Sequence, residues 1–285
     1  MNDTRKIKLT LKARTTMEGA GVKLKRVFGY NEIPLFDPFL LLDHFGSDNP
    51  NDYLKGFPWH PHRGIETITY MINGKVQHRD SLGNEGIISS GDIQWMTAGS
   101  GIIHEEMPKR TDGNMMGFQL WANLPKSHKM MNPRYQDIKE SQIPIINLDN
   151  NVIIKVICGD IQGIKGPVKD IITEPEYLDI EIPPNTEFVH EVKSKNTVFA
   201  YIFEGSGYFD DNLDREKNVG ELVVYQEGSN IKITTKDSHV RFLLISGKPI
   251  EESIAWGGPI VMNTKEELQL AFNEFNNGTF IKATS

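Results

Sequence analysis

Residues 70–74 read YMING and residues 91–93 read GDI, and both patterns occur a second time in the chain. The second copies are YIFEG at 201–205 and GEL at 220–222, at offsets of 131 and 129 residues. Each copy has the form of a strand, a glycine turn, a further strand, and then a glycine and an acid that open the next strand. Two matches in the same order and at nearly the same offset predict two similar β-domains.

Strand patterns dominate the rest of the chain. Short runs rich in β-branched and aromatic residues recur between clusters of glycine, proline, asparagine and aspartate, which favours a sandwich or a barrel. These runs lie at 65–72, 86–88, 93–96, 117–121, 152–157, 198–203, 222–225, 231–234 and 240–245. One helix is predicted, because Thr264 and the acids after it form a capping sequence and residues 276–278 (NNG) form a stop. Its Leu268, Phe272 and Phe275 are expected to contact the core.

The segment 125–141 lies between the two copies, is polar and contains two prolines, which is typical of a domain junction. We therefore expect one domain at 1–135 and a second at 136–285, with the helix at the end of the second. The 285 residues, of which 38% are hydrophobic, suffice for one large domain or two domains of ordinary size.

The sequence indicates an intracellular protein. No apolar run approaches the roughly 20 residues that a membrane helix needs, and the N-terminus holds no apolar signal segment. Cys158 is the single cysteine, so neither an internal disulfide nor a thiolate metal cluster is available. We expect a cytoplasmic monomer without membrane contact, also found in the nucleus if the source is a eukaryote. Its chemistry must come from its 8 histidines and 38 acids.

Charge is distributed unevenly along the chain. The net charge is −7, which argues against direct binding of nucleic acid, but residues 1–26 carry about +6 of their own. Within them, residues 6–12 alternate between lysine and apolar side chains, so Ile7, Leu9 and Leu11 are expected to face a core. Lysines on an edge strand oppose aggregation, and an anionic partner is the alternative interpretation.

Two pairs of metal-binding residue types occur in the first domain. His60 and His62 are two apart, so in a strand both imidazoles point to one face and can bind one ion. His104 and Glu106 form a second pair of this spacing. A histidine two residues before an acid is common by chance, and residues 78–80 (HRD) show the same pattern, so context must decide.

The order of the motifs provides that context. The histidine pair precedes the strand at 70–74, and residues 91–101 lead directly to His104, which resembles the two-motif arrangement of the cupin superfamily. A closer resemblance, to the pirin family, is highly specific in 36–125, diffuse in 140–250, and includes the C-terminal helix. It is carried by 36–46 (FDPFLLLDHFG), 60–67 (HPHRGIET), 91–99 (GDIQWMTAG), 101–108 (GIIHEEMP), 119–121 (QLW) and 258–264 (GPIVMNT).

The resemblance implies an all-β bicupin, with two tandem β-barrel or jelly-roll cupin domains and one metal site in the first. The implied ligands of one mononuclear transition metal are His60, His62, His104 and Glu106. Glu66 occupies the position of a superfamily glutamate but is not a pirin ligand. Iron is the metal that the resemblance implies, while nitrogen and oxygen ligands also suit nickel, copper, cobalt, manganese or zinc. A closed zinc site is not favoured, because such sites usually include cysteine.

The second domain can be tested against the first by the repeat offsets. The four ligand positions correspond there to Glu191, Lys193, Ile233 and Thr235, which cannot form a transition-metal site. We therefore expect one metal per chain.

The resemblance also implies the activity of a quercetin 2,3-dioxygenase. A flavonol hydroxyl would bind the metal, Glu106 would accept its proton as general base, and dioxygen would cleave the ring with release of carbon monoxide. Gln119 and Trp121 share one face of their strand and could line the pocket, as could Asp43 from a loop. Arg63 and Asp80 are candidates for orienting the ligands, with simple solvation as the alternative.

A second function uses the same four ligands. Some pirins resemble redox-sensing regulators or transcription cofactors that act through contact with a protein partner and without catalysis. The ligand set cannot separate this function from an enzyme acting on a small aromatic substrate and dioxygen. A ligand-binding or isomerase cupin is a third interpretation.

Overall fold

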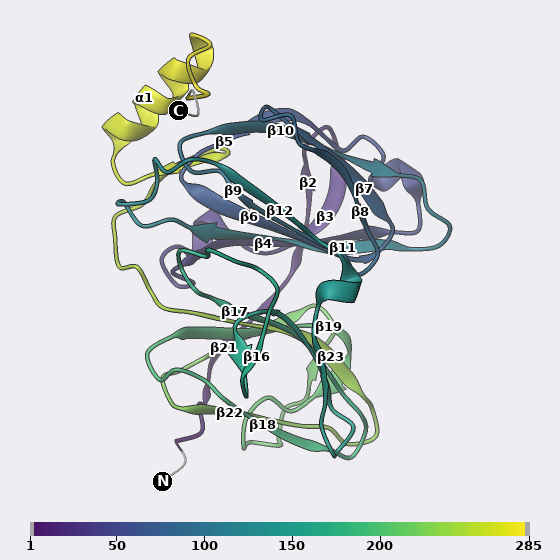
Figure 1. The fold of residues 1–285 in the computed structure, drawn as a ribbon. Coiled ribbons are helices and arrows are strands. Elements are labelled where there is room, and N and C mark those ends of the chain that lie inside the picture. The colour runs from purple at the N-terminus through teal and green to yellow at the C-terminus, as the bar shows by residue number, and fades with distance from the viewer. Residues whose placement is uncertain (1–2, 283–285) are drawn as a thin grey trace. The chain divides into compact units, whose positions relative to one another are not determined.

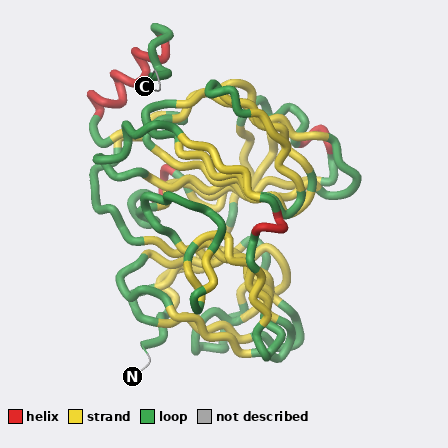
Figure 2. Tube along the Cα trace, in the orientation of Figure 1, coloured by secondary structure: helices red, strands yellow, loops and turns green. Residues whose placement is uncertain are grey.

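The computed structural model describes residues 3–282, which form two compact units. Within the described chain, the N-unit contains residues 14–140 and 250–282, and the C-unit contains residues 3–13 and 141–249. Strands make up most of both units, and the helices are few (Figure 1 and Figure 2). The prediction of an all-β fold is confirmed. Among the described residues, no helix is long and apolar enough to cross a membrane.

The N-unit is built on a seven-stranded and a four-stranded antiparallel sheet. The larger sheet has the order β12 (Arg134–Ile138), β9 (Ile93–Thr97), β6 (Ile65–Asn73), β11 (Met115–Asn123), β4 (Phe39–Ser47), β3 (Val22–Phe28) and β2 (Arg14–Glu18). The smaller sheet has the order β5 (Phe57–His62), β10 (Ile102–Lys109), β7 (Lys75–Asp80) and β8 (Glu85–Ser89). The pair β24 (Ala255–Gly257) and β25 (Ile260–Met262) and the helix α1 (Lys265–Asn276) complete the unit, with short 3-10 turns at Tyr30–Glu32 and Pro50–Asp52.

The C-unit is built on one eight-stranded sheet and two strand pairs. The sheet runs β1 (Ile7–Lys12), β21 (Glu221–Tyr225), β19 (Thr197–Gly207), β23 (Val240–Gly247), β17 (Glu176–Ile182), β14 (Ile153–Cys158) and β13 (Ile145–Asn147), with β20 (Lys217–Asn218) beside β19. The pairs are β18 (Glu187–Glu191) with β22 (Asn230–Thr234) and β15 (Asp160–Ile161) with β16 (Ile164–Lys165). A further 3-10 turn spans Glu140–Gln142 where the two units join in sequence.

The repeat found in the sequence corresponds to equivalent strand pairings. In β6 and β9, Tyr70 lies opposite Ile93. In β19 and β21, Tyr201 lies opposite Leu222. In both units, the glycine that precedes the second strand donates its N–H to a carbonyl of the first strand at 2.8 Å. The two units therefore share the same local construction.

The terminal segments do not follow the expected division at residue 135. Residues 3–13 contribute β1 to the C-unit, and residues 250–282 return to the N-unit together with α1. The segment 125–141, expected as a junction, contains β12, which pairs with β9. The exchange arises because the pairing partner of β1 is β21, more than 200 residues away in sequence, and such partners are not visible in a local pattern.

The predicted helix is confirmed as α1. Thr264 caps it and forms a capping box with Glu267. Leu268 and Phe272 pack against a buried cluster of the N-unit, as expected. Phe275 is 37% exposed, but its ring also contacts this cluster, through the buried Phe280.

The strand β1 lies at the edge of its sheet, and its Ile7 packs against the apolar core of the C-unit, as the alternation of residues 6–12 predicts. Arg5, just before this strand, is buried. All five of its N–H groups donate to backbone carbonyls at 2.8–3.0 Å. The acceptors are those of Lys193, Ser194, Asn196, Gln226 and Gly228. Arg5 thus ties the N-terminal segment to two others of the C-unit, residues 193–196 and 226–228.

We expect Arg5→Ala to lower the free energy of unfolding by about 2–4 kcal/mol, because the substitution leaves several buried carbonyls without a donor. Chemical denaturation of the full chain measures this loss. The matched control is Lys6→Ala, since Lys6 is exposed and forms only an ion pair with Asp211 at the surface, and such pairs contribute little. Equal effects of the two substitutions would contradict the prediction.

A buried histidine in β4 should make the stability of the N-unit depend on pH. Burial, with repulsion from the neighbouring Lys25, lowers the pKa of His44 from 6.5 to about 4. Between these values the unfolded chain binds the proton more readily than the folded chain, so stability falls as the pH falls from 6.5 toward 4. The full loss is about 3 kcal/mol. Urea titrations at several pH values should show this slope, and His44→Gln should remove that part of it.

Candidate metal centre

Three histidines meet on the four-stranded sheet of the N-unit. His60 and His62 are two apart on β5, and His104 lies directly opposite His60 on the neighbouring β10. Each offers a ring nitrogen, and these nitrogens all lie within 4.8 Å of one another. His62 and His104 are buried, and burial lowers the pKa of both well below 6.5, so that both rings are neutral. Neutral imidazoles are the form that binds metal ions.

Backbone carbonyls fix the protons of the first two rings. Nδ1 of His60 lies 2.8 Å from the carbonyl of Pro58, and Nδ1 of His62 lies 3.0 Å from the carbonyl of Pro259. A carbonyl can only accept, so each Nδ1 carries the hydrogen and each Nε2 of a neutral ring is bare. The two Nε2 atoms lie 3.1 Å apart.

Two bare nitrogens at this distance fit a metal ion. When both rings are neutral, neither nitrogen can donate to the other, and their lone pairs repel unless a cation lies between them. Two nitrogens bound at about 2.1 Å and at right angles to one ion would themselves lie about 3.0 Å apart. Nε2 of His104 is also buried and has no hydrogen-bond partner within residues 3–282. The cluster is therefore able to hold a metal.

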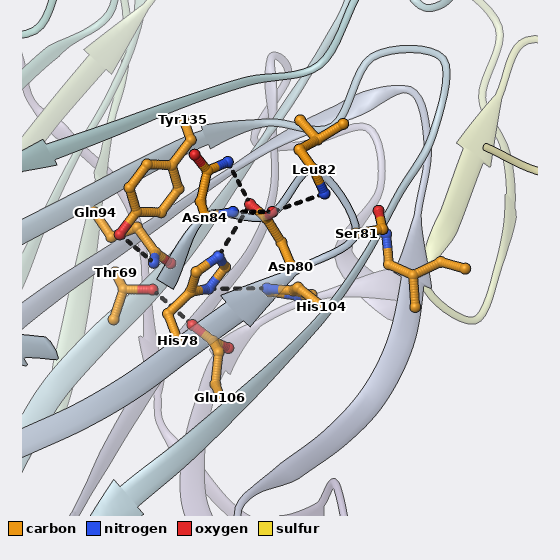
Figure 3. A network of polar contacts seen from close by, with 11 residues as sticks. Thr69, His78, Asp80, Ser81, Leu82, Asn84, Gln94, His104, Glu106 and Tyr135 are labelled. Carbon is orange, nitrogen blue, oxygen red and sulfur yellow. Dashed lines mark hydrogen bonds and ion pairs between the residues drawn. The ribbon is translucent and has the colours of Figure 1, made fainter. Parts of the chain in front are cut away.

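The fourth predicted ligand, Glu106, also lies on β10 and is buried. Its carboxylate belongs to a second close group, with His104 and His78, rather than to the group of the three histidines. Thr69 of β6 donates to Oε1 of Glu106 at 3.1 Å (Figure 3). The structure thus brings a carboxylate oxygen of Glu106 within 4.8 Å of a ring nitrogen of His104 and of His78.

His78 is a site residue that sequence reasoning discounted. It is fully buried on β7, directly opposite Glu106, and its neighbour along the sheet face, Asp80, lies opposite His104. Nδ1 of His78 lies 3.4 Å from Nδ1 of His104, and Nε2 lies 3.3 Å from Asp80 (Figure 3). The sequence shows a histidine two residues before an acid at 78–80, but only the pairing of β7 with β10 shows that these residues lie beside the proposed ligands.

A cavity of about 660 Å³ opens beside the histidines. It is enclosed mainly by aromatic and aliphatic side chains from both sheets and from the β24–β25 segment. The aromatic side chains of its lining are Tyr30, Phe45, Tyr53, Phe57, Trp121 and Trp256, and its polar side chains include Arg26, Asp43, Thr69 and Gln119. The edge of the Trp121 ring meets His62 with ring centres 5.0 Å apart. The volume suits a small organic molecule.

The expectation that Asp43 lies in a loop is wrong. It lies within β4, because residues 39–42 are part of a longer strand that continues to Ser47. Its carboxylate binds Arg26 of β3 through two hydrogen bonds of 2.9 and 2.8 Å. Burial raises the pKa of Asp43 even though Arg26 opposes this shift.

A polar row crosses the otherwise apolar wall of the cavity. Arg26 pairs with Asp43 across β3 and β4, and Asp43 with Gln119 across β4 and β11. Gln119 in turn lies opposite Thr69 on β6, and the Thr69 hydroxyl lies 2.8 Å from the side-chain oxygen of Gln119. Because Thr69 also reaches Glu106, the row connects Arg26 to the metal centre. Gln119 and Trp121 both line the cavity.

Arg63 and Glu66, which follow His62 closely in the sequence, are buried and have partners outside the histidine cluster. Arg63 neither orients a histidine nor faces water, since it is buried, binds Glu274 at 2.7 Å and donates to the carbonyl of Phe280. It ties the C-terminal segment to the N-unit. Glu66 accepts from Thr97 at 2.7 Å, on the face of β6 opposite to Thr69, and so points away from the cluster.

The interior of the C-unit is filled with apolar side chains. Ile233, at a position that corresponds to a ligand of the first domain, is part of this core, and Glu191 and Lys193 are exposed. His190 pairs with Glu176 at 3.0 Å. Within residues 3–282, the groups of close metal-binding side chains all lie in the N-unit.

Fold and site together define a protein of the cupin superfamily with two cupin domains, of which the first holds a histidine cluster able to bind a metal. Residues 21–122 match the pirin family, and residues 177–281 match the pirin C-terminal cupin domain. The chain belongs to the pirin family, as the sequence resemblance indicates.

Relatives and a solved structure agree with this assignment. A pirin-like protein of Caulobacter vibrioides is 42% identical over 95% of this chain and 97% of its own length. A Pseudomonas aeruginosa protein with the name "Putative quercetin 2,3-dioxygenase" is 40% identical over 92% of this chain and 93% of its own. The crystal structure of quercetin 2,3-dioxygenase from Acinetobacter baumannii is 31% identical, with a TM-score of 0.90 over 97% of this chain and 98% of its own.

Proposed function

We propose that this chain is a metal-dependent dioxygenase of the quercetin 2,3-dioxygenase type. One iron ion per chain would be held by Nε2 of His60, His62 and His104 and by a carboxylate oxygen of Glu106. The observation that carries the proposal is the pair of bare imidazole nitrogens 3.1 Å apart at the wall of a 660 Å³ cavity. The names of the Pseudomonas aeruginosa and Acinetobacter baumannii proteins support the choice of reaction.

The bound metal would supply Lewis acidity and a binding position for a substrate hydroxyl and for dioxygen. In the reaction, both atoms of O2 enter the flavonol, one ring carbon leaves as carbon monoxide, and the remainder is an ester of two aromatic acids. Glu106 accepts the proton of the flavonol 3-hydroxyl on a carboxylate oxygen. The hydrogen bond from Thr69 to Oε1 holds this carboxylate at the end of the polar row.

The rest of the cavity positions a flat, hydroxylated molecule. Aromatic side chains such as Trp121 and Phe57 give large planar contacts with an aromatic ring and exclude water from the reacting end. At the other end, Asp43 and Glu18 both bind Arg26, so that this cluster has an excess of negative charge. It would accept hydrogen bonds from substrate hydroxyls and disfavour a carboxylate or phosphate there.

Oxygen consumption and carbon monoxide release with quercetin test the proposal. The protein is loaded separately with iron, nickel and copper, and its metal content is measured in the same samples. We expect turnover by at least one metal form and one ion per chain. If every form retains its metal and none cleaves a flavonol, the enzyme proposal fails and the regulatory function gains support. Two ions per chain would overturn the single-site assignment.

A further inference from the structure

We propose that His78 and Asp80 are positioning residues that fix the protonation of His104, so that its Nε2 is the bare atom of the metal centre. The inference rests on the proposed metal ligands and goes beyond them, because His78 is not itself a ligand in this arrangement. The three groups form a line from Asp80 through His78 to His104 on adjacent strands (Figure 3).

Asp80 is the hydrogen-bond acceptor at one end of this line. Oδ1 of Asp80 accepts the backbone N–H groups of Leu82 and Asn84 at 2.9 and 3.0 Å. Oδ2 accepts the side-chain amide of Asn84 at 2.8 Å. Although burial alone would raise the pKa of Asp80, the hydrogen bonds from His78 and Asn84 lower it. Three N–H groups, from Leu82 and Asn84, donate to its two oxygens, so Asp80 is the hydrogen-bond acceptor of this line.

Each following proton position depends on the one before it. Because Asp80 accepts, Nε2 of His78 carries a hydrogen. Nδ1 of His78 faces Nδ1 of His104 at 3.4 Å, so one hydrogen lies between the two rings. Nε2 of His104 is buried and has no partner within the described chain, so a hydrogen there would have no acceptor, and the hydrogen between the rings is assigned to Nδ1 of His104.

The line gives His104 a different environment from the other two histidines. Nδ1–H of His60 and of His62 donates to a neutral backbone carbonyl, whereas Nδ1–H of His104 donates to an imidazole that is itself bound to a carboxylate. A charged group behind the acceptor strengthens the hydrogen bond and makes the opposite nitrogen a better electron donor. Tyr135 stacks on His78, with ring centres 5.0 Å apart, and so holds the plane of that ring.

The test is nitrogen NMR of the histidine rings in the full chain, metal-free and loaded with diamagnetic zinc. In the metal-free wild type we expect His104 with hydrogen on Nδ1 and a bare Nε2. In His78→Phe, which keeps a ring against Tyr135 but removes both nitrogens, we expect a mixture that includes hydrogen on Nε2. Zinc affinity, measured by chelator competition, should fall about 10–100-fold.

His78→Gln provides the rescue, because its amide can donate to Asp80 while its oxygen accepts from His104. We expect it to restore the tautomer of His104 and most of the zinc affinity. The inference is overturned if His104 keeps one tautomer in His78→Phe, or if zinc shifts the Nδ1 signal of His78 as it shifts a bound nitrogen. Because the tautomer is read without metal or substrate, an absence of flavonol cleavage would defeat the proposed function alone.

Discussion

The substitution His62→Ala is expected to reduce metal affinity by more than about 100-fold. Loss of a residue that only supports a ligand typically costs 10–100-fold, and His62 is proposed as a ligand itself. Two contacts place His62 in the middle of the proposed site. Its Nε2 lies 3.1 Å from Nε2 of His60, and its ring contacts Trp121 at the cavity wall. After dialysis, the variant should retain much less than one ion per chain, and flavonol cleavage should be lost with the metal.

A histidine of the C-unit is the matched control for this experiment. His190 pairs with Glu176 and its ring stacks on Phe188 of the C-unit core, so His190→Ala should keep one ion per chain. Thermal unfolding of both variants without metal shows whether either change disturbs the fold. If His62→Ala binds metal as tightly as the wild type while His190→Ala does not, the metal centre has been assigned to the wrong unit.

The sequence predicts the repeated unit well because its signals are local. Glycine turns, strand alternation and the cap at Thr264 each depend on a few neighbouring residues, and all reappear in the structure. The exchange of terminal segments could not be predicted in this way. The position of β1 depends on its pairing with β21, and that of α1 on a contact across more than 200 residues, the ion pair of Arg63 with Glu274.

The same distinction applies to the site. The spacing of His60 and His62 places both on one face of a strand, which is a local fact. The role of His78 depends on the register of β7 against β10, which sets it opposite Glu106 and sets Asp80 opposite His104. The buried setting of Asp43 likewise follows from its alignment with Arg26 on the next strand. These residues become visible as partners only when strand pairing is known.

The second large effect concerns proton transfer by Glu106. Glu106→Gln keeps the size of the side chain and an oxygen that can accept from Thr69, but the amide cannot take up the proton of the flavonol. General bases typically contribute 10²–10⁴-fold to a rate, so we expect kcat to fall by about that factor at saturating metal. Because the carboxylate is also a proposed ligand, metal affinity should fall as well, and kcat must be measured with the metal content of each sample known.

Glu105 provides a control within the same strand. It is the adjacent residue on β10, points to the other face, and binds Arg79 at 2.6 Å, so Glu105→Gln changes the same functional group without touching the cavity. We expect wild-type turnover and metal content from this variant. Should Glu106→Gln, fully loaded with metal, cleave the flavonol as fast as Glu105→Gln does, the proton must leave by another route. Among the described residues, the cavity lining offers only two other carboxylates, Asp43 and Glu18. Both bind Arg26, so the proton would then be taken up at the far end of the polar row.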